Sequence, residues 1–208
     1  MKVLGLDSSG LVAGVALIQD DVLIAEYTTD YKKTHSQTLL PMLDEISNMT
    51  ELDLSTIDAI AVAGGPGSFT GLRIGSATAK GLGLALEKPL ISIPTTAAIA
   101  YNIWDTDKFV CPIMDARRNQ VYTGVYCYTD HRLDTVWEQD TMSIEALAEG
   151  LNCLDHEVIF LGDGVAVYRE KLEALLTIPF SFAPAHVNRQ RAAAVSYTHL
   201  RAHETVLD

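Results

Sequence analysis

Apolar and polar residues alternate in short blocks along this chain, and the blocks predict strands separated by tight turns. The first strand covers residues 3–6 and ends in Asp7, and a Ser-Ser-Gly turn follows it. Two further apolar runs, over 11–18 and 22–27, are separated by a pair of aspartates, which is typical of a turn between antiparallel strands. The chain is therefore expected to begin with a three-stranded meander.

After the meander, the spacing of the apolar residues becomes helical. Residues 36–49 carry leucine, methionine and isoleucine on one broad stripe, so we expect a helix there. A short buried strand over 57–63, a helix over 70–86, a strand over 90–93 and a helix over 95–104 follow in order. Alternating strands and helices of this kind predict an α/β fold.

The second half of the chain repeats this order. The segment LDSSGLVAGVAL has the same plan as MDARRNQVYTGVY, and AIAVAGGPGSFTG has the same plan as EVIFLGDGVAVY. Each pair reads as a strand, a tight turn and a second element. We therefore expect two lobes with mixed sheets flanked by helices, over 1–105 and 106–195. The elements predicted in the second lobe are strands over 109–114, 120–128 and up to 140, a short helix over 143–149, a strand over 157–161 and a helix over 165–176.

The glycine-rich segment GGPGSFTG, over residues 64–71, is the most informative part of the sequence. It ends the apolar strand, and Ser68 or Thr70 can cap the helix that follows. Three interpretations remain open: a phosphate-binding turn, close packing of the helix on its own sheet, or close packing on a helix of a partner. The segment fits neither common phosphate-loop motif, and Pro66 removes one amide donor. Small residues recur at every fourth position of this helix: Gly71, Gly75, Ala79 and Gly83.

Composition narrows the choice of partners and of compartment. The net charge is −12, and the only cluster of basic residues that we single out is Arg117-Arg118, so tight binding of nucleic acid by this chain alone is not expected. No apolar run reaches the ~18 residues of a membrane span, and no signal peptide is recognisable, which favours the cytoplasm. We expect the three cysteines to be free, buried thiols. We expect four single histidines to lie at the surface without binding a metal. These residues are Cys111, Cys127 and Cys153, and His35, His131, His156 and His186.

Carboxylates at two strand ends suggest a nucleotide site. Asp7 with Ser8 and Ser9, and Asp115 across a cleft, are placed as in actin-like ATPases, although turn-capping is the common role of such residues. A Gly-Asp-Gly turn, with Gly162 and Gly164, resembles a phosphate loop. We interpret these six residues as a vestigial nucleotide cleft. The competing hypothesis is an active ATPase or small-molecule kinase of the same fold.

Several segments together resemble the TsaB family, from Met1 to about Val195. They are VLGLDSSG, HSQTLLPMLDEI, GGPGSFTGLRIG with KGLGLAL, PIMDARRNQVYTGVY, FLGDG and PAHVNRQRAA. The resemblance implies an actin-like, ribonuclease H-like (ASKHA) fold. It also implies a dimerisation subunit of the bacterial tRNA threonylcarbamoyladenosine machinery. Such a subunit pairs with a TsaD-type transferase, which modifies an adenosine beside the anticodon, and assembles with a TsaE-type ATPase.

The same comparison indicates a subunit without catalytic activity. Where the catalytic homologue carries a His-x-x-x-His metal motif, this chain reads PTTAAIAYN over 94–102, so we expect no metal and no cofactor. The partner contact is expected on the two helices of the first lobe, toward a TsaD-type subunit or a second copy of the chain, with tRNA reached only indirectly. Residues 196–208 resemble a translated adapter and are expected to be foreign. The expected contact residues are Thr38, Leu39, Met42, Ile46, Gly71, Arg73, Gly75, Thr78 and Ala79.

Overall fold

The computed structural model describes residues 1–30 and 35–196 and divides the chain into two compact units. Unit 1 contains residues 1–98 together with the segment from Gln190 on, and unit 2 contains residues 99–189. The division differs from the lobes expected from sequence in two ways. The boundary lies inside a helix, at residues 98 and 99, and residues 190–195 pack with unit 1 instead of unit 2.

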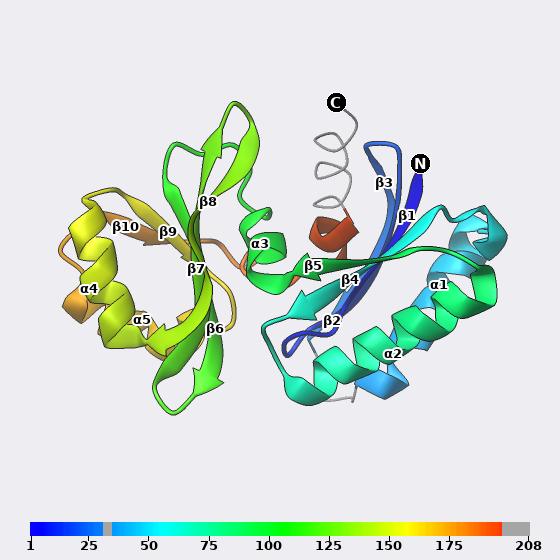
Figure 1. Ribbon diagram of the computed structural model, residues 1–208, viewed down its shortest axis with the longest axis horizontal. Helices are drawn as coiled ribbons and strands as arrows, with labels where there is room; N and C mark the ends of the chain where they lie inside the picture. Colours follow the sequence, from blue (N-terminus) through cyan, green and yellow to red (C-terminus); the bar gives the residue numbers. More distant parts are fainter. Residues whose placement is uncertain (31–34, 197–208) are drawn as a thin grey trace. The chain divides into compact units, whose positions relative to one another are not determined.

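Unit 1 is built on a five-stranded mixed sheet of order β3-β2-β1-β4-β5 (Figure 1). The predicted meander is present: β1 pairs antiparallel with β2, and β2 with β3. The two later strands are parallel to β1, because each is reached through a crossover helix. The strands are β1 (Lys2–Asp7), β2 (Ala13–Gln19), β3 (Val22–Thr29), β4 (Ala59–Gly65) and β5 (Leu90–Pro94).

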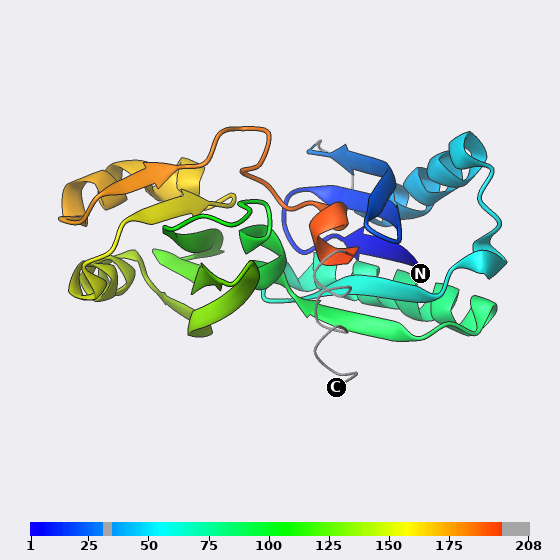
Figure 2. The ribbon, with the colours of Figure 1, turned by 90° about the horizontal axis from the view of Figure 1, so that it is seen from above.

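Helices α1 (Leu39–Thr50) and α2 (Phe69–Leu86) cover one face of this sheet. Alternate residues of each strand serve the two faces. Leu4 and Leu6 pack with the two helices, whereas Val3 packs with Val195 on the opposite face. Val195 belongs to a helical segment over residues 192–196, drawn in red beside the N-terminal strands in Figures 1 and 2. Unit 1 is therefore a three-layered arrangement.

Local signals explain where the helices of unit 1 begin and end. The Ser68 hydroxyl accepts a hydrogen bond from the Gly71 amide, which makes Ser68 the cap of α2. Both helices end at a glutamate in the left-handed conformation, Glu51 in α1 and Glu87 in α2. The remaining helices of this part of the chain are short: η1 (His35–Gln37), η2 (Leu54–Thr56) and α3 (Thr95–Ala100), the last ending before the predicted residue 104.

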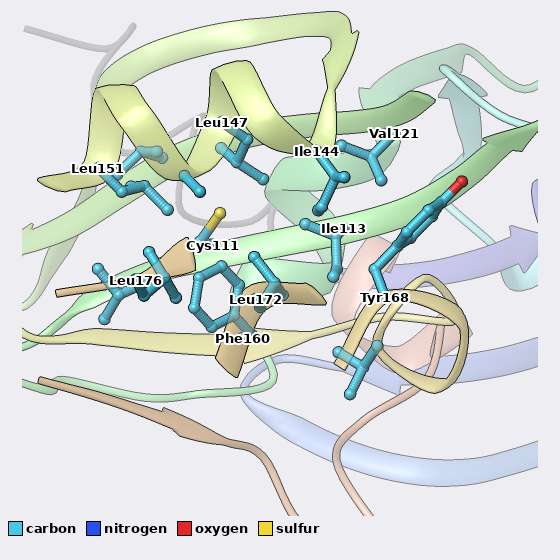
Figure 3. Packing of buried hydrophobic residues seen from close by; sticks show 14 of the residues in the cluster. Cys111, Ile113, Val121, Ile144, Leu147, Leu151, Phe160, Tyr168, Leu172 and Leu176 are labelled. Atoms are coloured by element: carbon cyan, nitrogen blue, oxygen red, sulfur yellow. The ribbon is translucent and has the colours of Figure 1, made fainter. Parts of the chain in front are cut away.

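Unit 2 repeats the topology of unit 1, with sheet order β10-β9-β6-β7-β8. Its two helices pack on one face of the sheet, and Figure 3 shows the apolar side chains of β6, α4 and α5 that meet there. The sequence repeat is thus a structural repeat, although α4 runs past the predicted residue 149 and β10 was not predicted. The elements are β6 (Phe109–Arg117), β7 (Gln120–Thr129), β8 (Arg132–Ser143), α4 (Ile144–Leu154), β9 (Val158–Leu161), α5 (Val165–Leu175) and β10 (Phe180–Phe182).

Candidate functional site

The turn after β1 is tied into the interior of unit 1. Asp7 is 1% exposed, and its Oδ1 accepts hydrogen bonds from the amide and the hydroxyl of Ser9, at 2.8 and 2.6 Å. The Ser8 hydroxyl donates to the Gly71 carbonyl at 2.9 Å, and the Ser9 carbonyl accepts from the Ser68 amide at 2.7 Å. The turn is therefore fastened to the beginning of α2 by side chains and backbone alike.

Several polar atoms around this turn are buried without a partner. His35, expected at the surface, is half-buried, and its Nε2 lies 2.9 Å from the Gly10 carbonyl oxygen. Among the described residues, no hydrogen bond is formed by Asp7 Oδ2, by His35 Nδ1 or by the side-chain amide of the fully buried Gln190. Burial raises the pKa of Asp7, against the Ser9 hydrogen bonds and the nearby His35, which lower it.

The glycine row of α2 packs on the chain's own sheet. Gly71, Gly75 and Ala79 are buried. A Cβ on Gly71 would lie 2.0 Å from the Ser8 carbonyl oxygen, and one on Gly75 would lie 2.5 Å from the Ser8 hydroxyl. Of the three interpretations of this row, close packing on the own sheet is correct. Strands and the Asp7 turn occupy the side of the helix that carries Gly71 and Gly75, so the contact of Gly71, Gly75 and Ala79 with a partner stays a prediction.

The contact residues predicted on α1 are also used inside unit 1. Leu39, Met42 and Ile46 belong to the core between α1, α2 and the sheet, and Thr38 is buried at the start of the helix. They face inward because the stripe identified in the sequence is the stripe that unit 1 itself buries. That part of the prediction is therefore corrected. Among the nine residues predicted, Arg73 is exposed and Thr78 is half-buried.

The outer side of α2 borders an open groove. The groove lies between α2 and the edge strand β5, has a volume of about 590 Å³ and is lined mainly by apolar side chains. We call it the α2–β5 groove. At its rim the Arg73 guanidinium lies 3.8 Å from the centre of the Phe69 ring, and Phe69 is 69% exposed. Of the residues that line this groove, Arg73 and Ala79 were singled out from the sequence, whereas Phe69, Ala77 and Lys80 on α2 were missed. Its main residues are Phe69, Arg73, Ala77, Lys80 and Leu90.

In unit 2, Asp115 organises the end of β6. Its Oδ1 accepts hydrogen bonds from the Arg117 amide at 2.9 Å and from the Tyr168 hydroxyl at 3.0 Å. Its own amide donates to Asp163 Oδ1 at 3.2 Å. Burial raises the pKa of Asp163. Burial and the hydrogen bond to Asp115 likewise raise the pKa of Tyr168.

The Gly-Asp-Gly turn uses its glycine amides within unit 2. The Gly162 amide donates to the Asn188 side-chain oxygen at 2.9 Å, and the Gly164 amide donates to the Ile113 carbonyl at 3.0 Å. Gly162 has a φ of +101°, and a Cβ there would lie 2.2 Å from the Ile113 carbonyl oxygen. The glycines are thus required by packing. The cleft expected between Asp7 and Asp115 stays a prediction.

The remaining candidate residues carry little chemistry. The described residues contain no group of three or more histidine, cysteine or carboxylate side chains that could hold a metal ion. Burial raises the pKa of Cys111 to about 12, whereas Cys153 is exposed, so the expectation that all thiols are buried is wrong. His199 and His203 lie outside the described residues. Within the described part of the chain, no helix combines the length and the apolar character needed to cross a membrane.

Comparison with known sequences finds relatives along most of the chain. A family model described as TsaD, tRNA N6-adenosine threonylcarbamoyltransferase, matches residues 23–206. The tRNA threonylcarbamoyladenosine biosynthesis protein TsaB of Bacillus subtilis is 36% identical over 176 residues, covering 85% of this chain and 77% of that protein. The TsaB protein of Escherichia coli is 31% identical over 170 residues, covering 79% of this chain and 72% of that protein.

Comparison with solved structures agrees on the fold. The structure described as YeaZ from Pseudomonas aeruginosa superposes with a TM-score of 0.82 at 26% identity, covering 98% of this chain and 92% of that chain. An inorganic polyphosphate/ATP-glucomannokinase from Arthrobacter superposes with a TM-score of 0.56 at 14% identity, covering 98% of this chain and 99% of that one. The second match concerns the fold alone and supports the expected actin-like architecture.

Proposed function

Since the chain belongs to the TsaB family of tRNA threonylcarbamoyladenosine biosynthesis proteins, we propose that it is a non-catalytic subunit of that machinery. In this proposal it pairs with a TsaD-type transferase, works with a TsaE-type ATPase in the cytoplasm, and reaches tRNA only through the assembly. Its net charge of −12 supports indirect contact with tRNA, because a polyanion is repelled by an acidic surface.

The non-catalytic part of the proposal is supported by the backbone amides of two candidate phosphate turns, the turn after Asp7 and the Gly-Asp-Gly turn over residues 162–164. Phosphate binding requires amides that point at the ligand and are free to donate. The amides of Gly162 and Gly164 donate to Asn188 and Ile113, and the Ser9 amide donates to Asp7. The chain therefore satisfies these donors itself. This argues against the competing hypothesis of an ATPase or small-molecule kinase.

The outer face of α2 is our proposed pairing surface, in place of the buried residues first predicted. A partner helix lying in the α2–β5 groove would cover Phe69 and Leu90, which are 69 and 40% exposed. Burial of large apolar side chains is what stabilises association, at roughly 25 cal/mol per Å² of apolar surface. The central residue Ala77 is small and exposed, so it lets a second helix approach α2 closely.

Co-purification with the TsaD-type protein, followed by a tRNA modification assay with and without this chain, tests the proposal. Ala77→Glu places a charged side chain in the groove without touching the core of unit 1. We expect it to weaken pairing by about tenfold or more, with unchanged thermal unfolding of the isolated chain. Ala146→Glu is the matched control, because Ala146 is also an exposed helical alanine but lies on α4. It should pair as wild type does.

Three results would contradict parts of this proposal in different ways. If wild type does not pair at all, the assignment as a TsaD-type partner fails. If wild type and Ala77→Glu pair equally well, the contact lies on another surface. If the purified chain alone hydrolyses ATP with a metal ion, and Asp7→Ala abolishes the turnover, the competing hypothesis is correct. A second copy of the chain in the groove would appear as a dimer that Ala77→Glu dissociates.

A further inference from the structure

The turn between β6 and β7 holds two arginines in an unusual backbone conformation. Arg117, Arg118 and Asn119 have φ values of 68°, 53° and 64°, so three consecutive residues other than glycine are left-handed. Two-residue turns of this hand favour Asn-Gly or Asp-Gly, since a side chain such as that of arginine is unfavourable at positive φ. The local sequence alone therefore does not explain this conformation.

Contacts from other elements hold the turn in place. On one side Asp115 Oδ1 accepts the Arg117 amide at 2.9 Å and is itself fixed by the Tyr168 hydroxyl. On the other side the Asn119 side-chain amide donates to Glu145 Oε2 at 2.7 Å, and the Lys171 ammonium binds both Asn119 and Glu145. Residues of α4 and α5 thus fix both ends of the turn. Unfavourable conformations that the surroundings enforce are commonly found at functional sites.

These contacts leave the two guanidinium groups unengaged. Arg117 and Arg118 are exposed, and the hydrogen bonds and ion pairs found among the described residues include none to either guanidinium. The chain carries a net charge of −12, so its own carboxylates are abundant and yet none of the described ones neutralises this pair. The turn backbone is held in place, and each guanidinium carries a planar fork of donors that suits carboxylate or phosphate oxygens in bidentate geometry.

We propose that the Arg117–Arg118 turn binds an acidic segment of a protein partner in the assembly. A carboxylate-bearing segment fits better than RNA, since two phosphate contacts are too few to overcome repulsion between RNA and an acidic protein. The turn belongs to unit 2 and the α2–β5 groove to unit 1, so different units form the two surfaces. This inference rests on the proposed function, because it takes the TsaD-type and TsaE-type subunits as the partners in which the acidic segment lies.

The test measures binding of the full chain to each of these two proteins, with tRNA as a third probe, between about 50 and 200 mM salt. Replacing both arginines by Arg117→Gln and Arg118→Gln is expected to weaken binding to one protein by about tenfold at low salt. The salt dependence of that affinity should decrease as well. Arg118→Gly should also lose affinity, yet it should unfold at a temperature no lower than wild type, because glycine favours positive φ. Loss of affinity with retained stability separates binding from misfolding.

A second turn of the same kind supplies the control. Asp130 and His131, with φ values of 49° and 63°, join β7 to β8, and the exposed Arg132 follows them at the opposite end of β7 (Figure 1). Arg132→Gln removes the same charge and should bind as wild type. Equal affinity of wild type and double variant for both proteins would overturn the inference, and so would a loss confined to tRNA. Failure of wild type to bind either protein would overturn both this inference and the proposed function.

Discussion

The Ser8 hydroxyl donates a hydrogen bond to the Gly71 carbonyl at 2.9 Å, and the Ser8 carbonyl occupies the space where a side chain on Gly71 would begin. The first turn of the chain and the first turn of α2 are therefore packed backbone against backbone. Gly71 has no β-carbon, and this absence permits the close approach. The glycine row therefore serves the packing of α2 inside unit 1.

Gly71→Ala should destabilise the protein by about 3 kcal/mol or more, because the added Cβ meets a backbone carbonyl that cannot move aside. Gly81→Ala is the matched variant on the same helix. A Cβ there has nothing within 4 Å, and alanine favours helix by about 0.8–1 kcal/mol, so stability should rise. Denaturant unfolding measures both. Similar effects of the two substitutions would mean that α2 does not rest on the turn.

Asp7→Asn should change how stability depends on pH. The folded-state pKa of Asp7 is raised above its ordinary value of 3.8 by burial. The folded protein therefore binds the proton more tightly than the unfolded chain, and this stabilising contribution is lost as pH rises through the folded pKa. Relative to the variant, wild type should lose up to about 1.4 kcal/mol per pH unit between about pH 4 and the folded pKa of Asp7, and nothing further above it. Urea unfolding of both proteins from acid to neutral pH measures the difference, and parallel curves would contradict the assignment.

Glu26→Ala should destabilise unit 1 by about 1–2 kcal/mol, because it removes the acceptor of the Arg191 guanidinium and of the Ala193 amide, while the part-exposed guanidinium can still be solvated. Glu26 lies on β3 and is 11% exposed at its side chain. Its carboxylate accepts hydrogen bonds from the Arg191 guanidinium and, at 3.1 Å, from the Ala193 amide. Glu45→Ala on the exposed face of α1 should stay within about 0.5 kcal/mol of wild type. Thermal unfolding that does not separate the two variants would show that the ion pair contributes little.

Two truncated chains should distinguish the contribution of residues 190–196 to stability from that of the tail that follows. Ser196, predicted to begin a foreign tail, is in fact buried, and its hydroxyl donates to the Ala192 carbonyl at 3.0 Å. A chain that ends at Ser196 should unfold within about 0.5 kcal/mol of the full chain. A chain that ends at Gln190 should lose several kcal/mol, since burying Val195 alone contributes roughly 1.5–3 kcal/mol. Equal stability of the two truncated chains would contradict the role given to this segment.

Local signals account for the parts of the fold that could be predicted. Alternating apolar runs and turn residues were enough for the meander, and Ser68 with the glycines that precede it was enough for the start of α2. Helical spacing also identified the small face of α2. It did not identify what covers that face. A helical periodicity shows which residues share a face, but not whether a strand of the same chain or a helix of another chain packs on it. For this reason the sequence did not show that most of the contact residues predicted on α1 and α2 are buried inside unit 1.

Contacts between distant residues account for the parts that could not be predicted. The Glu26–Arg191 pair joins residues 165 positions apart, so no window of sequence contains both. Strand β10 has three residues and depends on pairing with β9. The left-handed conformation of Arg118 opposes the preference of arginine, and only the contacts of Asn119 and Asp115 with α4 and α5 explain it.

Residues 190–196 complete unit 1, but the ribosome makes them only after all of unit 2. The chain therefore cannot fold strictly in the order in which it is synthesised. When residue 98 has left the ribosome, the sheet of unit 1 still lacks the helix that covers Val3 and Ala61. Unit 2 is continuous in sequence and can fold first, while this apolar face of the unit 1 sheet is still exposed to solvent. A nascent chain arrested near residue 189 should therefore bind a hydrophobic dye or a chaperone, and release from arrest should remove that binding.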